Sequence, residues 1–467
     1  MHCLSIKIAA LNFFIRITDL HTLQQLKAGQ LGPVKRLRLS EKLTDFPTEI
    51  FSLADSLEIL DLSDNELTAL PDDFARLHKL KILFLSNNQF RHLPNVLGNC
   101  ASLEMISFKA NKLISIAEGA FPLQTRWLIL TGNQITKLPD VMGKLSRLQK
   151  LALAGNKLSV LPASMANCKN LELVRLSANQ LDCLPDWLVQ LPKLSWLAFS
   201  GNRFNRYLCA QTKSMLKVDL ADISLQEKIG EGASGVIYRA KWLKQPAGLA
   251  TDVKDIAVKL FKGDVTSDGY PIDELNCCLQ AGEFPNLIKV VAQIADDTQL
   301  GLVMELIPIN YKNLGLPPSL ETCTRDTFAD GTFFTSLQIG KIALQMAETL
   351  THLHEKGISH GDLYAHNTMI NNHASLLFGD FGASSNLNAL PQLQIEAVES
   401  IESRAFGCFL EDLLKQHAVA VDEEIALLQQ LTQLKEACLQ SNPVFRPRFK
   451  EITAKLQSLL IESEIQV

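Results

Sequence analysis

The sequence predicts an α/β solenoid of short repeats followed by an α+β domain of a different kind. Asparagines recur at a nearly constant interval through the first half of the chain, and the recurrence stops near residue 205. A glycine-rich loop, a strand-like segment with a lysine, and two aspartate-containing motifs follow in the second half. A chain of 467 residues is long enough for two or more domains of this size.

The first half contains seven similar segments, such as LEILDLSDNEL and LQKLALAGNKL. In each segment a short strand points its leucines inward, and the asparagine amide can pair main-chain groups that would otherwise be buried without a partner. These segments resemble the leucine-rich repeat family over residues 34–205, which implies a solenoid with an N-terminal cap over residues 1–33. The asparagines, spaced by 23, 23, 22, 23, 23 and 23 residues, are Asn65, Asn88, Asn111, Asn133, Asn156, Asn179 and Asn202.

Alternation along each strand predicts which side chains face the concave side of the solenoid. The positions four and six residues before each asparagine form two columns there, and both columns are rich in apolar and aromatic residues. An exposed apolar strip of this kind often marks a protein interface, although scattered apolar residues also occur on repeat surfaces without a partner. The residues predicted to contact a protein substrate or partner are Ile82, Phe84, Met105, Trp127, Ile129 and Trp196.

Composition excludes several classes of protein. Apolar residues make up 47% of the chain and charged residues 20%, as in soluble globular proteins and unlike disordered chains. Residues 1–217 carry 26 Lys and Arg against 17 Asp and Glu, a net charge of +9, and the remaining residues carry 19 against 33, a net charge of −14. The positive charge is not gathered in a basic run, so we do not expect a nucleic-acid-binding protein. No apolar run reaches the length of about 18 residues that a membrane helix needs, and the cysteines form no CxxC pair, so we expect a cytoplasmic protein with free thiols.

A glycine-rich loop follows a connector over residues 206–217. Its GxGxxG spacing occurs both in dinucleotide-binding folds and in kinases. A dinucleotide-binding loop opens a helix, whereas the β-branched and aromatic residues after this loop favour a second strand. We therefore expect a hairpin whose main-chain amides cover nucleotide phosphates. The candidate nucleotide-binding residues are Ile229, Gly230, Glu231, Gly232, Ala233, Ser234, Gly235, Val236 and Ile237.

From this loop onward the sequence resembles the eukaryotic-like protein kinase domain, over residues 218–460. By that resemblance, Lys259 in the segment DIAVK binds the α and β phosphates of ATP, and Ala257 lies in the nucleotide site. Glu274 in the next helical segment is the expected partner of Lys259, and Asp273 is the competing candidate.

The resemblance also implies two lobes joined by a hinge. The apolar run over residues 300–306 is similar to the strand that enters the hinge, with Met304 in the gatekeeper position. Main-chain groups of Glu305 and Ile307 would then bind adenine. The expected fold class is thus an α/β leucine-rich repeat solenoid followed by an α+β bilobal protein-kinase-like domain.

Two motifs carry the phosphotransferase chemistry. The segment HGDLYAHN resembles the kinase HRDxxxxN element, and the DFG motif begins 13 residues after its asparagine. By this resemblance Asp362 positions and deprotonates the acceptor hydroxyl, while Asn367 and Asp380 hold Mg²⁺ between the phosphates. A carboxylate and an amide supply the hard oxygen ligands that Mg²⁺ prefers, and Mn²⁺ remains an alternative.

The C-terminal residues continue the resemblance. Glu402 lies in a segment that is similar to the start of the central helix of the kinase fold, where an acidic residue is expected. Arg446 lies in a segment that resembles the closing CxxxxPxxRPxF element.

Three features depart from the kinase pattern. Gly361 replaces the arginine of HRD, so a phosphate on the activation segment would lack its usual counter-charge, and we expect a loop that is assembled without phosphorylation. Tyr364 replaces the lysine that serine/threonine kinases carry two residues after the catalytic aspartate. Only 20 residues separate Gly382 from Glu402, and the APE motif is missing, so Glu396 or Glu399 would have to pair with Arg446.

These departures leave three hypotheses open. The first is a soluble protein kinase, directed at serine or threonine, whose repeats recruit a substrate or partner. The others are a small-molecule kinase, because HGD is reminiscent of aminoglycoside and choline phosphotransferases, and a pseudokinase scaffold that only binds. A repeat array fused directly to a kinase resembles the soluble leucine-rich-repeat kinases of bacteria.

Overall fold

The chain divides into two compact units. The structure is a computed structural model, and it describes residues 20–205, 216–232, 234–247, 249, 255–263, 265–266, 268–295, 299–418 and 425–465. Among these residues, the repeat unit holds residues 20–194 and 202–204, and the C-terminal unit holds residues 195–201 and 205 onward. The predicted repeat array over residues 34–205 therefore contributes one short segment to the other unit.

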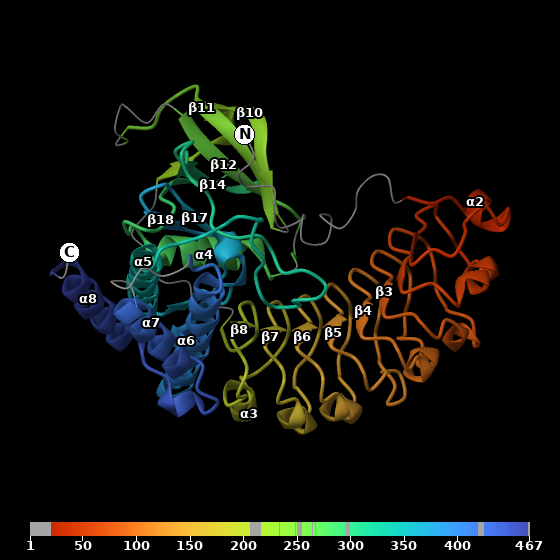
Figure 1. The fold of residues 1–467 in the computed structure, drawn as a ribbon. Helices are drawn as coiled ribbons and strands as arrows, with labels where there is room; N and C mark the ends of the chain where they lie inside the picture. Colours follow the sequence, from red (N-terminus) through yellow and green to blue (C-terminus); the bar gives the residue numbers. More distant parts are fainter. Residues whose placement is uncertain are drawn as a thin grey trace. The chain divides into compact units, whose positions relative to one another are not determined.

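The repeat unit is a curved ladder of three-residue parallel strands (Figure 1). Each strand takes one residue from each of the two concave columns and a buried aliphatic residue between them, and equivalent residues of neighbouring repeats are in register, as in Ile59↔Ile82 and Ile82↔Met105. The strands are β1 (Arg36–Arg38), β2 (Ile59–Asp61), β3 (Ile82–Phe84), β4 (Met105–Ser107), β5 (Trp127–Ile129), β6 (Lys150–Ala152) and β7 (Leu173–Arg175).

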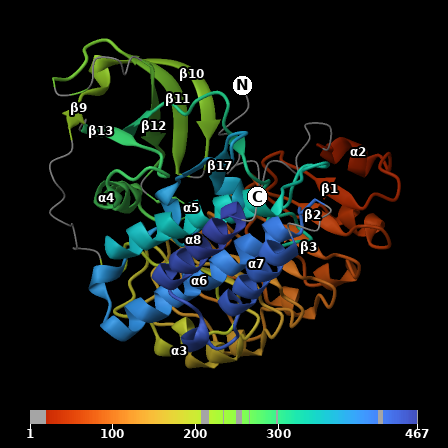
Figure 2. The same cartoon turned by 60° about the vertical axis from the view of Figure 1, so that its left-hand side comes forward.

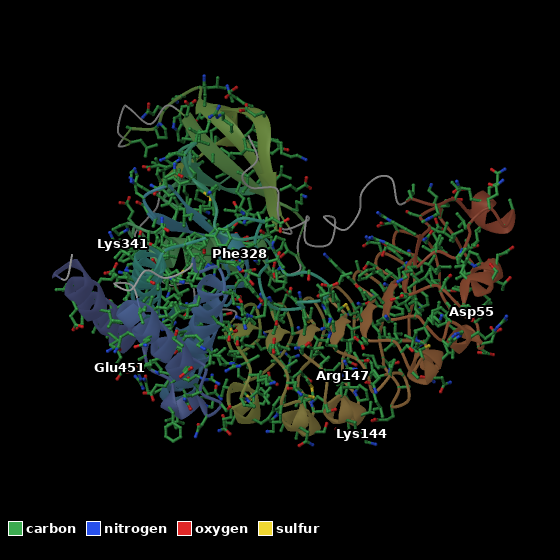
Figure 3. All side chains as sticks on the ribbon, in the orientation of Figure 1. Asp55, Lys144, Arg147, Phe328, Lys341 and Glu451 are labelled. Carbon is green, nitrogen blue, oxygen red and sulfur yellow. The ribbon has the colours of Figure 1, made fainter. Side chains whose placement is uncertain are left out.

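Short helices form the outer side of this unit. Several begin directly after a proline, whose missing N–H costs nothing at that position. Asp55, just after the helix over residues 48–53, and Lys144, the last residue of the helix over residues 140–144, lie on this outer side (Figure 3). The helices are α2 (Leu23–Lys27), η2 (Thr48–Leu53), η3 (Phe74–Arg76), η4 (Asn95–Asn99), η5 (Asp140–Lys144), η6 (Ala163–Asn167) and α3 (Asp186–Val189).

The asparagines form a buried ladder of the kind that the sequence predicts. Asn133 is typical: its Oδ1 accepts from the amide of Leu113 at 3.0 Å, and its Nδ2 donates to the carbonyls of Phe108 and Leu130, each at 2.9 Å. Each amide thus ties its own turn to the preceding repeat, because a buried main-chain group needs a partner.

Replacing Asn133 with alanine is expected to lower the free energy of unfolding by about 2–4 kcal/mol, because the buried amide of Leu113 and carbonyl of Phe108 lose this partner and the carbonyl of Leu130 loses one of its two donors. Urea denaturation of the full chain measures this loss. Asn167→Ala, at the exposed end of η6, is the matched control and should change stability little. Equal losses in the two variants would contradict a structural role for the ladder.

The concave strip was expected to be exposed, and for most of its residues this is wrong. Ile82, Met105 and Ile129 are buried, with 8%, 4% and 8% of their surface exposed. Each side chain in these columns is flanked by its counterparts on both neighbouring strands, which lie only about 4.8 Å away. Phe84 and Trp127 are half-buried, and the Nζ of a neighbouring lysine lies 4.1 Å from the ring centroid of Trp127. The sixth predicted residue, Trp196, belongs to the C-terminal unit and is also buried there.

The C-terminal unit begins with a twisted sheet and one helix (Figure 2). The strand order is β10-β11-β12-β14-β13-β9, and only the β13–β9 pair is parallel. A core of aliphatic residues, including Ile256, Val258 and Val303, lies on this sheet. The elements are β9 (Lys217–Val218), η7 (Leu220–Asp222), β10 (Ile223–Glu231), β11 (Gly235–Trp242), β12 (Asp255–Phe261), α4 (Pro271–Ala281), β13 (Val290–Ala295) and β14 (Leu300–Glu305).

A larger helical lobe follows this sheet, so the unit has two lobes (Figure 1). Its long helices are α5 (Ser336–Glu355), α6 (Gln392–Leu414), α7 (Ile425–Cys438) and α8 (Phe449–Ile465), and Figure 3 labels Lys341 on α5 and Glu451 on α8. Among the described residues, no helix is both long and apolar enough to cross a bilayer. The short elements of this lobe are β15 (Lys312–Asn313), β16 (Ile358–Ser359), η8 (Ala365–Asn367), β17 (Thr368–Ile370), β18 (Leu376–Phe378), η9 (Phe381–Ala383), β19 (Ser385–Asn386), η10 (Leu387–Ala389) and η12 (Pro443–Phe445).

Candidate active site

Lys259 lies near the end of β12, between Ile237 on β11 and Leu302 on β14 in the sheet. Its ammonium forms an ion pair with the carboxylate of Glu274 on α4 and lies 4.0 Å from Oδ1 of Asp380. Lys259 is 8% exposed and Glu274 4%, so water screens this pair little.

The two carboxylates determine the charge state of Lys259. Burial lowers the pKa of its ammonium, but Glu274 and Asp380 outweigh burial, and the pKa is raised above its ordinary value. Lys259 therefore stays positively charged at neutral pH. Of the two acidic candidates on α4, Glu274 and not Asp273 forms the ion pair.

The glycine-rich segment is a hairpin, as the residues after it predict. Strand β10 ends with Ile229, Gly230 and Glu231, and strand β11 begins with Gly235, Val236 and Ile237. The turn between them contains Gly232, whose amide donates to the carbonyl of Gly235, and Ser234. Ala233 lies outside the described residues. A methyl group at Gly235 would lie 2.5 Å from the carbonyl oxygen of Leu260, so only glycine fits where the start of β11 pairs with the end of β12.

Glu231 has a second role at the hairpin. Its carboxylate pairs with Lys262 just beyond β12 and with Lys228 at 2.9 Å. Hydrogen bonds from Lys262 and Lys228 lower the pKa of Glu231, so these ion pairs hold the hairpin to the neighbouring strand at neutral pH.

The segment after β14 is the expected hinge. Ala257 pairs with Met304 across β12 and β14, and Ala257 is 4% exposed. The amide of Glu305 donates to the carbonyl of Lys289 at 3.0 Å, so an adenine contact at Glu305 would use its carbonyl. Ile307 borders a cavity of about 500 Å³ that Leu287 and Leu377 also line, and this cavity includes neither Lys259 nor the two aspartates of the motifs.

Asp362 and Asn367 form a tight pair in the loop between β16 and β17. Nδ2 of Asn367 donates to Oδ2 of Asp362 at 2.8 Å and to the Asp362 carbonyl at 3.0 Å. Because Nδ2 of Asn367 makes both of these bonds, its Oδ1 points away from Asp362 and could bind a cation.

Two buried side chains hold this loop in place. Glu402 on α6 accepts from the amide of Gly361 at 2.7 Å and contacts Nε2 of His354 at 2.6 Å. Nε2 of His360 lies 3.1 Å from the carbonyl of Gly379, the residue before Asp380. Burial lowers the pKa of His360, so its ring is neutral at physiological pH. His360 therefore links the Asp362 loop to the Asp380 segment.

Asp380 adopts a left-handed backbone conformation, with φ of 62° and ψ of 75°. Its side chain accepts from the amide of Gly382 at 3.3 Å and, as described, faces Lys259. The structure thus brings the predicted residues of both motifs and of the lysine pair into one region between the sheet and the helical lobe.

The segment after the DFG motif is short and buried. β19 pairs with β16, and α6 begins directly after Pro391. Ser384 and Ser385, two and three residues after the DFG glycine, are 1% and 0% exposed. Phosphorylation of either hydroxyl would require this segment to open.

Arg446 is held differently from the sequence-based expectation. Its guanidinium donates to the carbonyls of Gln440 at 2.8 Å and Ser400 at 3.2 Å, and burial lowers its pKa to about 10. Glu396 and Glu399, the expected substitutes for the missing glutamate, lie elsewhere: Glu396 pairs with Arg448 at 2.9 Å, and Glu399 lies 4.0 Å from a histidine.

Asp326 is a site residue that sequence reasoning missed. Its carboxylate accepts from the amide of Ala365 and contacts Nδ1 of His366 at 2.6 Å, so it supports the loop between Asp362 and Asn367 from the side of the helical lobe. Asp326 lies in a stretch without periodicity or motif, and no sequence signal marks it.

Comparisons with known proteins agree with the geometry. Residues 223–401 match the protein kinase domain family, and residues 34–90, 123–181 and 146–204 match the leucine rich repeat family. The chain carries leucine-rich repeats followed by a protein kinase domain.

Curated relatives are distant. A probable serine/threonine-protein kinase of Dictyostelium discoideum is 22% identical over 284 residues, which cover 53% of this chain and 29% of that protein. Human cyclin-dependent kinase 11A is 29% identical over 210 residues, which cover 40% of this chain and 24% of that protein. The chain thus spans less than a third of the length of these relatives, and the expected bacterial type is not borne out by them.

Proposed function

We propose that this chain, in which leucine-rich repeats precede a protein kinase domain, is an ATP-dependent protein kinase that transfers the γ-phosphoryl group to serine or threonine hydroxyls. The observation that carries the proposal is the assembled pair of clusters. Lys259, Glu274 and Asp380 form one, Asp362 and Asn367 form the other, and His360 connects the two loops. A degenerate scaffold has no need to keep both clusters assembled.

ATP would bind under the hairpin that precedes β11. Lys259 would bind the α and β phosphates, and its pairing with buried Glu274 fixes the ammonium in position. The carbonyl of Glu305 and main-chain groups of Ile307 would bind adenine, with Ala257 against the ring.

The donor set fits a magnesium ion, since Asp380 offers a carboxylate and Asn367 an amide oxygen. When bound, Mg²⁺ neutralises charge that develops on the phosphates. The pairing of Asn367 with Asp362 orients the amide toward this task before any ligand arrives.

Asp362 would orient the acceptor hydroxyl and take its proton. The hydrogen bond from Asn367 fixes the orientation of its carboxylate for this proton transfer. Tyr364 cannot supply the positive charge that a lysine supplies at this position in serine/threonine kinases. The positive charge that stabilises the phosphates in this site would therefore come from Lys259.

We assign the repeats to recruitment of a protein substrate or partner, in the cytoplasm. Leucine-rich repeats commonly present extended surfaces to proteins. The name of the Dictyostelium relative supports serine/threonine specificity.

The test is ATP turnover and transfer of labelled phosphate by the full chain with Mg²⁺ and a generic protein acceptor. Asp362→Asn is expected to reduce transfer by about a hundredfold or more, and Lys259→Met should reduce it comparably. The matched controls are exposed residues of the same type, Asp330→Asn and Lys450→Met, which should keep full activity.

Phosphoamino-acid analysis of the labelled acceptor then gives its residue preference. Binding of ATP without labelled protein, in the presence of a small hydroxylated acceptor that becomes labelled, would favour the small-molecule kinase. No transfer to any acceptor would favour the scaffold.

A further inference from the structure

The C-terminal unit contains one strand that has the sequence of a leucine-rich repeat. This repeat-type segment, residues 195–201, includes β8 (Trp196–Ala198) and reads SWLAFSG, in step with the preceding repeats. It nevertheless belongs to the kinase unit. Its three strand residues are all buried, with exposed fractions of 2%, 1% and 0%.

The segment first contacts the catalytic loop. The indole of Trp196 stacks on the ring of Tyr364 with centroids 4.7 Å apart and planes inclined by 6°, and its Nε1 donates to the carbonyl of Leu363 at 2.9 Å. Leu363 and Tyr364 directly follow Asp362. Trp196 therefore holds the main chain and the side chain next to the proposed proton acceptor.

Its second contact is with the activation segment. The amide of Phe199 donates to Oγ of Ser385 at 3.0 Å, and Oγ of Ser200 donates to the carbonyl of Ser384 at 2.6 Å. Both serines follow the DFG motif by a few residues. The repeat-type segment thus fixes the part of the chain that phosphorylation orders in many kinases.

Its ends contact two helices. Oγ of Ser195 lies 3.9 Å from Sγ of Cys408 on α6. Gly201 approaches the start of α4 so closely that a methyl group there would lie 2.5 Å from the ring of Tyr270 and 2.7 Å from the carboxylate of Asp273. Both helices hold residues of the site, since α4 carries Glu274 and α6 carries Glu402.

Gly361 connects these contacts with the loss of the HRD arginine. Its φ is +69°, and a methyl group on it would lie 2.6 Å from the carbonyl oxygen of Leu197 and 2.7 Å from that of Ala383. No larger residue fits there while the repeat-type segment is in place. The position that binds the phosphate of the activation segment in related kinases is thus occupied by main chain of residues 195–201.

We propose that residues 195–201 are a built-in brace that positions the catalytic loop and the activation segment for transfer, with Trp196 as its principal positioning residue. The brace does the work that a phosphorylated activation segment does elsewhere, and it is present from synthesis. The effect of the brace on the rate of transfer rests on the proposed kinase function. Its effect on the order of the catalytic loop and the activation segment does not.

The test uses the full chain and two independent measurements. Hydrogen exchange without ATP reports the order of residues 382–391, and steady-state kinetics reports kcat and the KM for ATP. Ser200→Ala removes one hydrogen bond and should speed exchange over residues 382–391 by about tenfold. Trp196→Ala should lower kcat by about tenfold to a hundredfold with the KM for ATP nearly unchanged, because Leu363 and Tyr364 lie beside Asp362 and not at the adenine site.

Trp196→Phe distinguishes positioning from simple loss of volume. It keeps a ring over Tyr364 and loses the bond to Leu363, so its kcat should lie between those of the parent and Trp196→Ala. Trp187→Phe, on α3 at the outer side of the repeat unit, is the matched control and should leave both measurements unchanged.

Unchanged exchange over residues 382–391 in Ser200→Ala would overturn the brace, as would a normal kcat in Trp196→Phe or in folded Trp196→Ala. If Trp196→Ala does not fold, the other two variants decide the question. If the parent chain transfers no phosphate, the kinase proposal fails while the exchange measurement still decides the brace.

Discussion

A chain that begins at Leu216 is expected to transfer phosphate about a thousandfold more slowly than the full chain, although it contains the whole region that resembles a kinase. It lacks residues 195–201, so the carbonyls of Leu363 and Ser384 and the hydroxyl of Ser385 lose their partners. Tyr364 also loses the ring stacked on it. The catalytic loop and the activation segment both become free to move, and misplacement by about 1 Å already costs about a hundredfold in rate.

Steady-state kinetics of the two chains under identical conditions measures this loss. Addition of a separately purified fragment of residues 1–205 provides the control, because it returns residues 195–201 without restoring the covalent link. Recovery of activity on addition is expected. A truncated chain as active as the full chain would show that the kinase region is complete from residue 216.

Replacing Glu402 with alanine is expected to lower the free energy of unfolding by about 3–5 kcal/mol. Glu402 is 1% exposed and holds both the amide of Gly361 and the ring of His354. Its loss leaves a buried amide and a buried imidazole without their acceptor, beside a cavity. Chemical denaturation measures the change, and Glu396→Ala, on the exposed face of the same helix, should have a much smaller effect.

The pH dependence of this stabilisation follows from the charge of Glu402. Burial opposes ionisation, but the hydrogen bond and charge of His354 and the amide of Gly361 outweigh it, and the pKa of Glu402 in the folded chain lies below its ordinary value. A depressed carboxyl pKa stabilises the fold fully above the unfolded value of about 4.3, and the stabilisation is lost as the pH falls through the folded value.

The difference in unfolding free energy between the parent and Glu402→Gln should therefore shrink as the pH falls below about 5, where the parent also becomes neutral. Denaturation curves at a series of pH values test this expectation. A difference that grows on acidification would mean that Glu402 is not ionised in the fold.

Sequence reasoning works here where function depends on short motifs or on a strict period. The asparagine ladder follows from spacing alone, because in every repeat the amide oxygen accepts from a main-chain amide of the preceding repeat and the amide nitrogen donates to a carbonyl 25 or 26 residues earlier. The resemblance of the motifs to kinases gives the fold of the second half, and the glycine loop is a hairpin because strand-forming residues follow it.

Other features depend on contacts between residues far apart in sequence. Trp196 has the sequence context of an exposed repeat position, and only its contact with Tyr364, 168 positions later, makes it part of the kinase unit. Asp326 lies in a stretch without pattern, so its support of His366 cannot be inferred from composition or spacing. The sequence correctly predicts that the apolar columns lie on strands. Alternation along one strand does not, however, predict how much of each side chain its neighbours on adjacent strands bury.

Burial of the activation segment affects how the signal of such an enzyme would change with time. Kinases with an accessible phosphorylation site are turned on and off within minutes by opposing enzymes, while the amount of protein stays constant. Here Ser384 and Ser385 are buried, and Gly361 offers no side chain to bind a phosphate. On the proposed function, the output of this kinase would follow how quickly the chain is made and degraded.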